Sequence, residues 1–219
     1  MDQLLSTNVA TNLYWFGRHL ERVETTLVDV IEIFDCVIDT DKEAGRRYFE
    51  HLEIELDYAN ASQFLNNAIF GDHPSNLAEI MRFARENAII ARAYIDADAF
   101  GETIHLAELF DHASRSAVNV DYRFVDDALS LINEIWGSMS RGLVRCKSDH
   151  FVRLGKLTEK VDLHLRHGKD GEEPIEYLNT ILQTAQKIAP PEAKLAISHT
   201  DEKANLDAIN ALINDLVVY

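Results

Sequence analysis

The feature that most constrains the fold is an apolar repeat near the start of the chain. Between residues 13 and 37, apolar side chains recur at alternating intervals of three and four residues without a break. They are Leu13, Phe16, Leu20, Val23, Leu27, Val30, Phe34 and Val37. This heptad-type spacing places one apolar seam along a helix. The pattern predicts a helix over about residues 8–38, and a helix of that length must pack along others in a bundle.

The rest of the chain is predicted to form further helices joined by short turns. Helical patterns cover about residues 43–69 with a break near Asn60, 77–117 with a bend near Gly101, 121–144, 149–168, 174–189 and 200–217. The 219 residues contain only 9 Gly and 4 Pro, and no stretch alternates for long as a strand would. The sequence therefore predicts an all-α fold, a single domain over residues 1–219 built as one bundle of about six to eight helices.

The charge of the chain argues against some classes of binding partner. The formal net charge is −16, which argues against binding to nucleic acid or to an anionic membrane surface. No apolar run approaches the roughly 18 residues of a membrane span, and the first residues lack the pattern of a signal peptide. We therefore expect a soluble cytoplasmic protein that binds neither nucleic acid nor membrane.

A short charged phrase occurs twice. The stretches "GRHLERVE" at residues 17–24 and "GKLTEKVD" at residues 155–162 share a Gly, a base, a Glu, a second base, a Val and an acid at matching positions. A shift of 138 residues that superposes the two phrases also superposes the apolar seam, placing Leu13 on Phe151 and Val23 on Val161. This agreement predicts an internal two-fold repeat that relates the helices at about 8–38 and 149–168.

The charged residues of these phrases are the first candidates for a ligand-binding site. They are Arg18, Glu21, Arg22, Lys156, Glu159 and Lys160. Aromatic residues on the same helix indicate that these charges are enclosed, and enclosed charges must be paired. Two interpretations stay open. The phrases form either a polar chamber for a small zwitterionic or anionic ligand, with Arg as the bidentate holder, or a purely structural ion-pair network.

A third polar group lies in "ARENAIIAR", within an otherwise apolar helical pattern. It contains Glu86, Asn87 and Arg92. Asn87 is the least expected of them, because Asn is a poor helix former and usually has a reason to lie mid-helix. This group is interpreted either as a third wall of the same chamber or as a local network.

No motif for a metal, cofactor or known catalytic reaction was found. Glu102 and His105 have the Glu-x-x-His spacing of di-iron bundles, but the chain has no second copy of that motif. No Gly-rich phosphate loop, nucleophile elbow or paired Cys motif is present. We therefore expect no metal and no cofactor, and the sequence leaves open whether the protein is an enzyme.

Three motifs together resemble a known family. "NLYWFGRHLERVE" resembles the opening motif of the alpha-E domain family, bacterial all-helical proteins named for their helices and a recurrent Glu-Arg pair. "ARENAIIAR" and "FVRLGKLTEKVD" are similar to its central and late motifs, and the three occur in order between residues 12 and 162. The chain departs from the family at Lys156 and Lys160, where Arg is favoured. Lys cannot replace Arg at a bidentate contact without loss.

The resemblance implies a set of site residues and a biochemical context. The family's polar positions fall on Arg18, Glu21, Arg22, Glu86, Asn87, Arg92, Glu159 and Lys160. Members are typically encoded beside ATP-grasp-type ligases and transglutaminase-like proteins. The leading hypothesis is therefore a component of an ATP-grasp-linked pathway that makes or modifies peptide or amide bonds. In it, the Arg/Glu/Asn cluster would bind a small charged ligand.

Within this hypothesis each residue type has a role. Arg18 and Arg92 would hold a carboxylate or phosphate, while Glu21 or Glu86 would meet an amine or act as a base. A second hypothesis is a non-catalytic helical partner of the ligase or transglutaminase-like protein, with the charged motifs as a structural network. A third, metal-dependent oxidation, would use Glu102 and His105.

Overall fold

The computed structural model describes residues 5–141, 147–167, 173–188 and 202–218. Every regular element in these ranges is a helix, so the predicted all-α class is confirmed. The helices are α1 (Thr7–Asp39), α2 (Ala44–Glu50), α3 (Ala61–Phe70), α4 (Leu77–Ala91), α5 (Ala97–Ser114), α6 (Tyr122–Ser140), α7 (Lys147–Arg166), α8 (Glu173–Ala185) and α9 (Glu202–Val218), with a 3₁₀ turn at Arg92–Tyr94.

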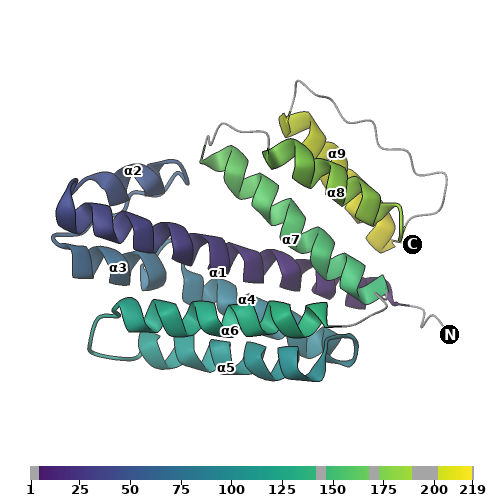
Figure 1. The fold of residues 1–219 in the computed structure, drawn as a ribbon, viewed down its shortest axis with the longest axis horizontal. Coiled ribbons are helices and arrows are strands. Elements are labelled where there is room, and N and C mark those ends of the chain that lie inside the picture. Colours follow the sequence, from purple (N-terminus) through teal and green to yellow (C-terminus); the bar gives the residue numbers. More distant parts are fainter. Residues whose placement is uncertain (1–4, 142–146, 168–172, 189–201, 219) are drawn as a thin grey trace.

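Helix α1 is the central element around which the others pack. Its start is fixed by Ser6, whose side-chain oxygen accepts a hydrogen bond from the Val9 amide at 3.3 Å. At 33 residues it is about 50 Å long and runs the length of the molecule (Figure 1). The predicted seam is its buried stripe. Six of its eight side chains are fully buried, namely Leu13, Phe16, Leu20, Val23, Leu27 and Val30.

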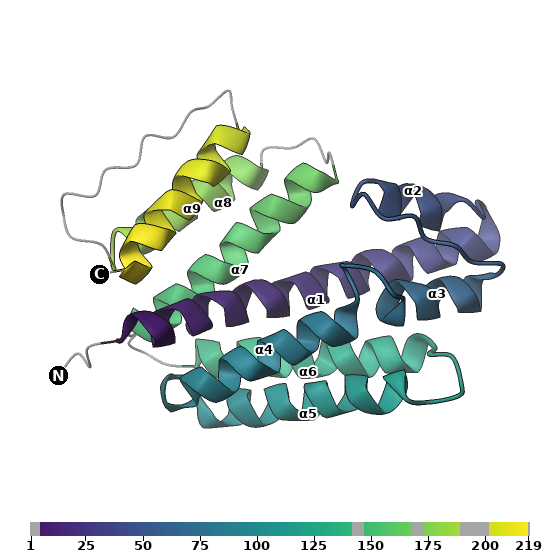
Figure 2. The same cartoon turned by 180° about the vertical axis from the view of Figure 1, so that it is seen from behind.

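The remaining helices lie in two groups on either side of α1. Figures 1 and 2 both show α4, α5 and α6 on one side, and α7, α8 and α9 on the other. Helices α1 and α7 come together near their N-terminal ends and then diverge (Figure 1).

The described ranges contain nine α-helices, so the prediction of six to eight was too low. One reason is that the pattern over 43–69, counted as one helix with a break near Asn60, is two helices, α2 and α3, and Asn60 caps the start of α3. The connection between them buries alternate side chains, Ile54, Leu56 and Tyr58, while the residues between these are exposed. Such two-residue alternation is typical of extended backbone and cannot continue a helical stripe.

The second reason is a break at residues 92–96. Asp96 begins α5, and its side chain accepts hydrogen bonds from the backbone amides of Asp98 and Ala99. An Asp that caps a new helix must leave the helical conformation, so α4 and α5 are separate. Gly101, where a bend was expected, lies inside the regular helix α5.

The buried apolar residues form two clusters. The larger one surrounds α1 and is built mostly from α1 to α6. The smaller one joins α7 to α8 and α9, and it includes Tyr14 of α1. No helix in the described part of the chain is long and apolar enough to cross a membrane.

Candidate functional site

Two glycines allow α1 and α7 to cross in close contact. A Cβ atom on Gly17 would overlap the carbonyl oxygen of Val152 and lie 3.1 Å from the amide nitrogen of Lys156. A Cβ atom on Gly155 would in turn overlap the carbonyl oxygen of Tyr14 and lie 2.9 Å from the amide nitrogen of Arg18. The contacts are reciprocal under the 138-residue shift. Both obstacles are backbone atoms, which cannot rotate away, so glycine is required on each helix here.

In one half of the crossing, Glu159 of α7 receives two guanidinium groups from α1. Arg18 Nε donates to Glu159 Oε2 at 2.6 Å, and Arg22 Nε donates to Glu159 Oε1. Asp162 lies beside them, 3.3 Å from Arg18 Nη2 and 3.5 Å from Arg22 Nη2. Glu159 is completely buried. A buried charge needs compensation, and the two guanidinium groups provide it through charge-assisted hydrogen bonds, which are stronger than neutral ones.

The other half is the reciprocal arrangement. Here the carboxylate comes from α1 and the two bases come from α7. Glu21 of α1 lies 3.3 Å from Lys156 Nζ and 3.4 Å from Lys160 Nζ, both on α7. Glu24 takes the place that Asp162 has in the first half, 3.4 Å from Lys156 Nζ. Trp136 of α6 completes this half, because its indole Nε1 donates to Glu24 at 2.7 Å and its ring lies under Lys156.

The two halves differ in how well the buried carboxylate is satisfied. Glu21 is only 1% exposed. Apart from the two lysines, the described residues give it one side-chain hydrogen bond, from Thr25 Oγ1 to Oε1 at 3.2 Å. None of them donates a hydrogen bond to its Oε2, which forms only the ion pair with Lys156. Burial raises the pKa of Glu21, although Lys156 and Lys160 oppose the shift. A lysine ammonium group is a point charge, whereas an arginine guanidinium can bind both oxygens of a carboxylate. Glu21 is therefore bound less tightly by its lysines than Glu159 is by its arginines.

A cavity of about 160 Å³ opens beside this loosely held half. Its lining residues are Glu21, Thr25 and Asp29 of α1, Lys160, Leu163, His164 and His167 of α7, and Tyr177 of α8. All of its lining residues on α1 and α7 lie C-terminal to the Gly17 and Gly155 contact. The Nε2 atom of His164 is buried and has no hydrogen-bond partner among the described residues. Buried polar atoms normally have partners, so this wall is suited to a bound polar molecule.

Aromatic contacts adjoin the cavity. The ring of His167 stacks on Tyr48 of α2, with centroids 4.5 Å apart. The Tyr48 hydroxyl donates to Asp29 Oδ2 at 3.1 Å, and burial raises the pKa of Tyr48. Lys160 lies 5.6 Å from the ring centroid of Tyr177. The cavity is therefore bounded by charge at the crossing and by aromatic rings elsewhere.

Asn87 is not part of the ion-pair network, but its side chain contacts another helix, which explains an Asn in the middle of α4. Its Nδ2 atom lies 3.1 Å from Nδ1 of His19 on α1, and because Nδ2 can only donate, that imidazole nitrogen must accept. Burial, then the charges of Arg22 and Arg18, lower the pKa of His19 to about 4. Asn87 therefore fixes a neutral imidazole beside the Arg18 and Arg22 side chains.

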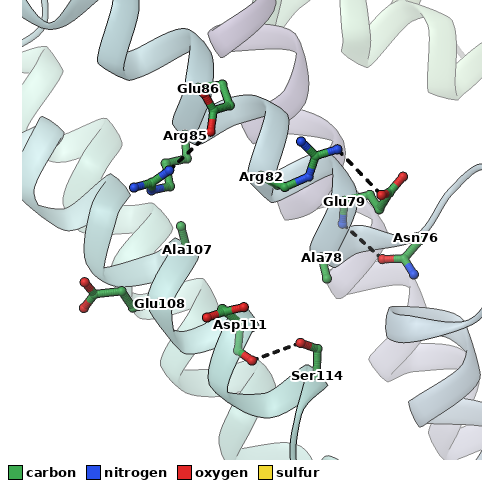
Figure 3. Close-up of a pocket in the computed structure, with 10 residues that line it drawn as sticks. All are labelled: Asn76, Ala78, Glu79, Arg82, Arg85, Glu86, Ala107, Glu108, Asp111 and Ser114. Atoms are coloured by element: carbon green, nitrogen blue, oxygen red, sulfur yellow. Dashed lines mark hydrogen bonds and ion pairs between the residues drawn. The ribbon is translucent and has the colours of Figure 1, made fainter.

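The other two candidates from the central motif do not join the chamber. Arg92 is exposed in the 3₁₀ turn and makes no ion pair with any described residue. Glu86 is exposed and pairs with its neighbour Arg85 at 3.3 Å. Both Glu86 and Arg85 line a separate groove of about 520 Å³ between α4 and α5 (Figure 3). The charged residues there are exposed, and Arg82 pairs within its own helix, so this groove is a solvated surface feature.

Among the described residues, no group of three or more His, Cys, Asp or Glu side chains is arranged to hold a metal ion. Glu102 and His105 lie on the exposed face of α5, with Oε2 and Nδ1 3.6 Å apart. His164 and His167 line the cavity described above.

Sequence reasoning missed several residues of the site. Glu24 and Asp162 are the closing acids of the two phrases, so the 138-residue shift already marked them as equivalent. Asp29 and Thr25 follow Glu21 at helical spacing on the same face of α1. Tyr177 and Trp136 carried no comparable signal, because only the packing of α8 and α6 brings them to the crossing.

This geometry defines an all-helical domain in which two crossing helices exchange buried Glu–base pairs. The chain belongs to the Alpha-E family, whose model is described as a predicted alpha-helical domain with a conserved ER motif and matches residues 5–173. The one Glu-Arg dipeptide in the sequence is Glu21–Arg22, at the centre of the crossing. No curated protein and no solved structure matches the chain at a significant level. The resemblance found in the motifs is thus confirmed.

Proposed function

We propose that this protein binds a small charged molecule in the cavity between α1, α7 and α8. The observation that carries the proposal is the state of Glu21, a nearly fully buried carboxylate in the cavity wall with one hydroxyl donor and two lysine charges as its partners. A buried carboxylate is stable when several hydrogen bonds satisfy it. A bound molecule with donors would supply the missing bonds.

The proposal agrees with a role in a pathway that makes or modifies peptide or amide bonds. Substrates of such pathways carry amines and carboxylates, and acidic and basic side chains both line the cavity. In this role the protein would work beside an ATP-grasp-type ligase or a transglutaminase-like protein, as the family resemblance implies. Glu86 and Arg92 would not contact the ligand, because both lie outside the cavity.

The binding proposal is tested by nuclear magnetic resonance with defined probes. The ring signals of His164 and Tyr177 are followed during titration with methylammonium, acetate, inorganic phosphate and glycine. We expect saturable shifts with at least one probe. The variant Leu163→Phe, which places a larger side chain in the cavity wall, should lose them. Leu157→Phe on the same helix is the control, since Leu157 packs against α8 and α9 instead. Absence of saturable shifts with all four probes would refute the proposal.

A second candidate function is a non-catalytic helical partner protein, for which the network is structural. The observation in its favour is that Arg18, Arg22, Glu159 and Asp162 already satisfy one another. Such a protein would keep its stability network and bind no small molecule. The same titration separates the two functions.

We further propose that α1 and α7 descend from an internal duplication. Support comes from the reciprocal Gly17 and Gly155 contacts and from the exchange of pairs between Glu21 and Glu159. All of these contacts obey the same 138-residue shift that the two phrases show.

A further inference from the structure

The difference between the two halves of the crossing points to the chemistry of the ligand. On α1 the bases are Arg18 and Arg22, whereas α7 has Lys156 and Lys160 at the equivalent positions. The arginines grip Glu159 with short hydrogen bonds, while both lysines stay 3.3 Å or more from Glu21. The cavity adjoins the lysine half. A lysine at position 160 thus leaves both space and an incompletely bonded carboxylate.

We infer that the ligand is a compact zwitterion whose ammonium group binds Glu21 and whose carboxylate binds His164 and Lys160. This rests on the proposed function and names its ligand class. An ammonium group supplies three donors, and Glu21 accepts only one hydroxyl hydrogen bond. Next along the cavity wall, Lys160 and the unpartnered Nε2 of His164 offer a cation and a possible donor for an anionic group.

The balance of charge favours a zwitterion over an ion of net charge. The paired network together with Asp29 contains five bases and five carboxylates, namely Arg18, Arg22, Lys156, Lys160 and Arg166 with Glu21, Glu24, Asp29, Glu159 and Asp162. A ligand with a net charge would leave that charge uncompensated in a partly buried site, which is costly. A zwitterion preserves the balance and meets both signs on the cavity wall.

The size of the cavity limits the ligand further. A volume of 160 Å³ corresponds to about five water molecules at their share of liquid volume. That space suits a short amino acid, such as glycine or β-alanine. Leu163 contributes an apolar patch for one or two methylene groups.

The test compares probes that share one end of the ligand. Glycine, β-alanine, methylammonium and acetate are titrated against the whole chain, with the His164 ring signals and calorimetry as readouts. We expect glycine or β-alanine to bind at least about tenfold more tightly than either single-charge probe, because each zwitterion gains a second charge-assisted contact. Binding of methylammonium or acetate as tight as that of both amino acids would overturn the inference and leave the proposed function standing. No binding by any of these probes would refute the inference, and it would refute the proposed function as well if inorganic phosphate also fails to bind.

The variant Lys160→Arg provides an independent check that does not depend on the probes. Arginine at this position can grip Glu21 as Arg22 grips Glu159, and its larger head occupies the cavity. We expect a raised urea midpoint together with at least a tenfold loss of amino-acid binding. Lys187→Arg, at an exposed lysine that does not line the cavity, is the matched control, and its binding should be unchanged. A Lys160→Arg protein that binds as tightly as wild type would overturn the inference.

Discussion

Replacing Gly17 with alanine is the sharpest test of the helix crossing. The added methyl group would overlap the carbonyl oxygen of Val152 and approach the Val152 carbonyl carbon to 3.0 Å. Since these atoms belong to the backbone of α7, the overlap is relieved only if the two helices separate. Separation would also lengthen the ion pairs of Arg18 and Glu21 on either side of the contact.

The magnitude follows from two opposing effects. Overpacking a close contact typically costs about 1–3 kcal/mol, and a rigid backbone obstacle places this site at about 3 kcal/mol. Alanine regains about 1 kcal/mol over glycine in a helix interior. The net expectation for Gly17→Ala is a loss of about 2 kcal/mol in the free energy of unfolding, and the same is expected for Gly155→Ala.

The assay is urea unfolding followed by circular dichroism, and the chain provides matched controls. Gly101 and Gly137 also lie inside helices, but a Cβ atom at either position meets nothing within 4 Å. Alanine at these two positions should therefore stabilise the protein by about 1 kcal/mol. If Gly17→Ala proves as stable as Gly101→Ala, the close crossing described above is wrong.

Three further predictions concern charge, pH and capping. Arg18→Met should lower the free energy of unfolding by about 3 kcal/mol in urea titrations, because Glu159 is left with one guanidinium in a buried site, while the exposed Arg115→Met should change it by less than about 0.5 kcal/mol. The pKa of His19 is lowered from 6.5 to about 4 in the folded protein. Between these two pH values the imidazole is protonated in the unfolded chain but not in the folded one. The free energy of unfolding therefore decreases as the pH falls from 6.5 to 4. Wild type should thus lose on the order of 2–3 kcal/mol more than His19→Gln between pH 7 and pH 4, and equal losses would contradict the neutral imidazole. Asp96→Ala should cost about 1 kcal/mol and reduce protection from hydrogen exchange in the first turn of α5, whereas unchanged exchange there would show that the cap is not needed.

The sequence predicted the elements in which one periodicity dominates. The α1 seam was found because eight apolar residues keep helical spacing, and the structure buries seven of them and partly buries Phe34. The segment after α2 was missed although Ile54, Leu56 and Tyr58 alternate there, because three buried positions are too few to outweigh the helical patterns on both sides. The break at Asp96 was missed because no Gly or Pro marks it.

The sequence predicted which charged residues belong to the site, but not which of them pair with one another. Sequence analysis indicated that Arg18 and Glu21 are enclosed and paired, but it did not name their partners. The structure directs each across the crossing, to Glu159 and to the α7 lysines. Partner choice depends on how closely two helices approach, and that is a tertiary property. Sequence reasoning also grouped Arg92 with Asn87, but the end of α4 separates them, and only Asn87 reaches α1.

The paired glycines also have a mechanical consequence. Two helices that touch most closely at one point behave as levers about that pivot. Thr25 and Leu163 each lie eight residues beyond the pivot on their own helix, about 12 Å away. A change of about 5° in the crossing angle would displace each by about 1 Å while the glycine contact itself hardly changes. The width of the cavity is therefore set by an angle, and packing at the far ends of α1 and α7, such as the stacking of His167 on Tyr48, holds that angle.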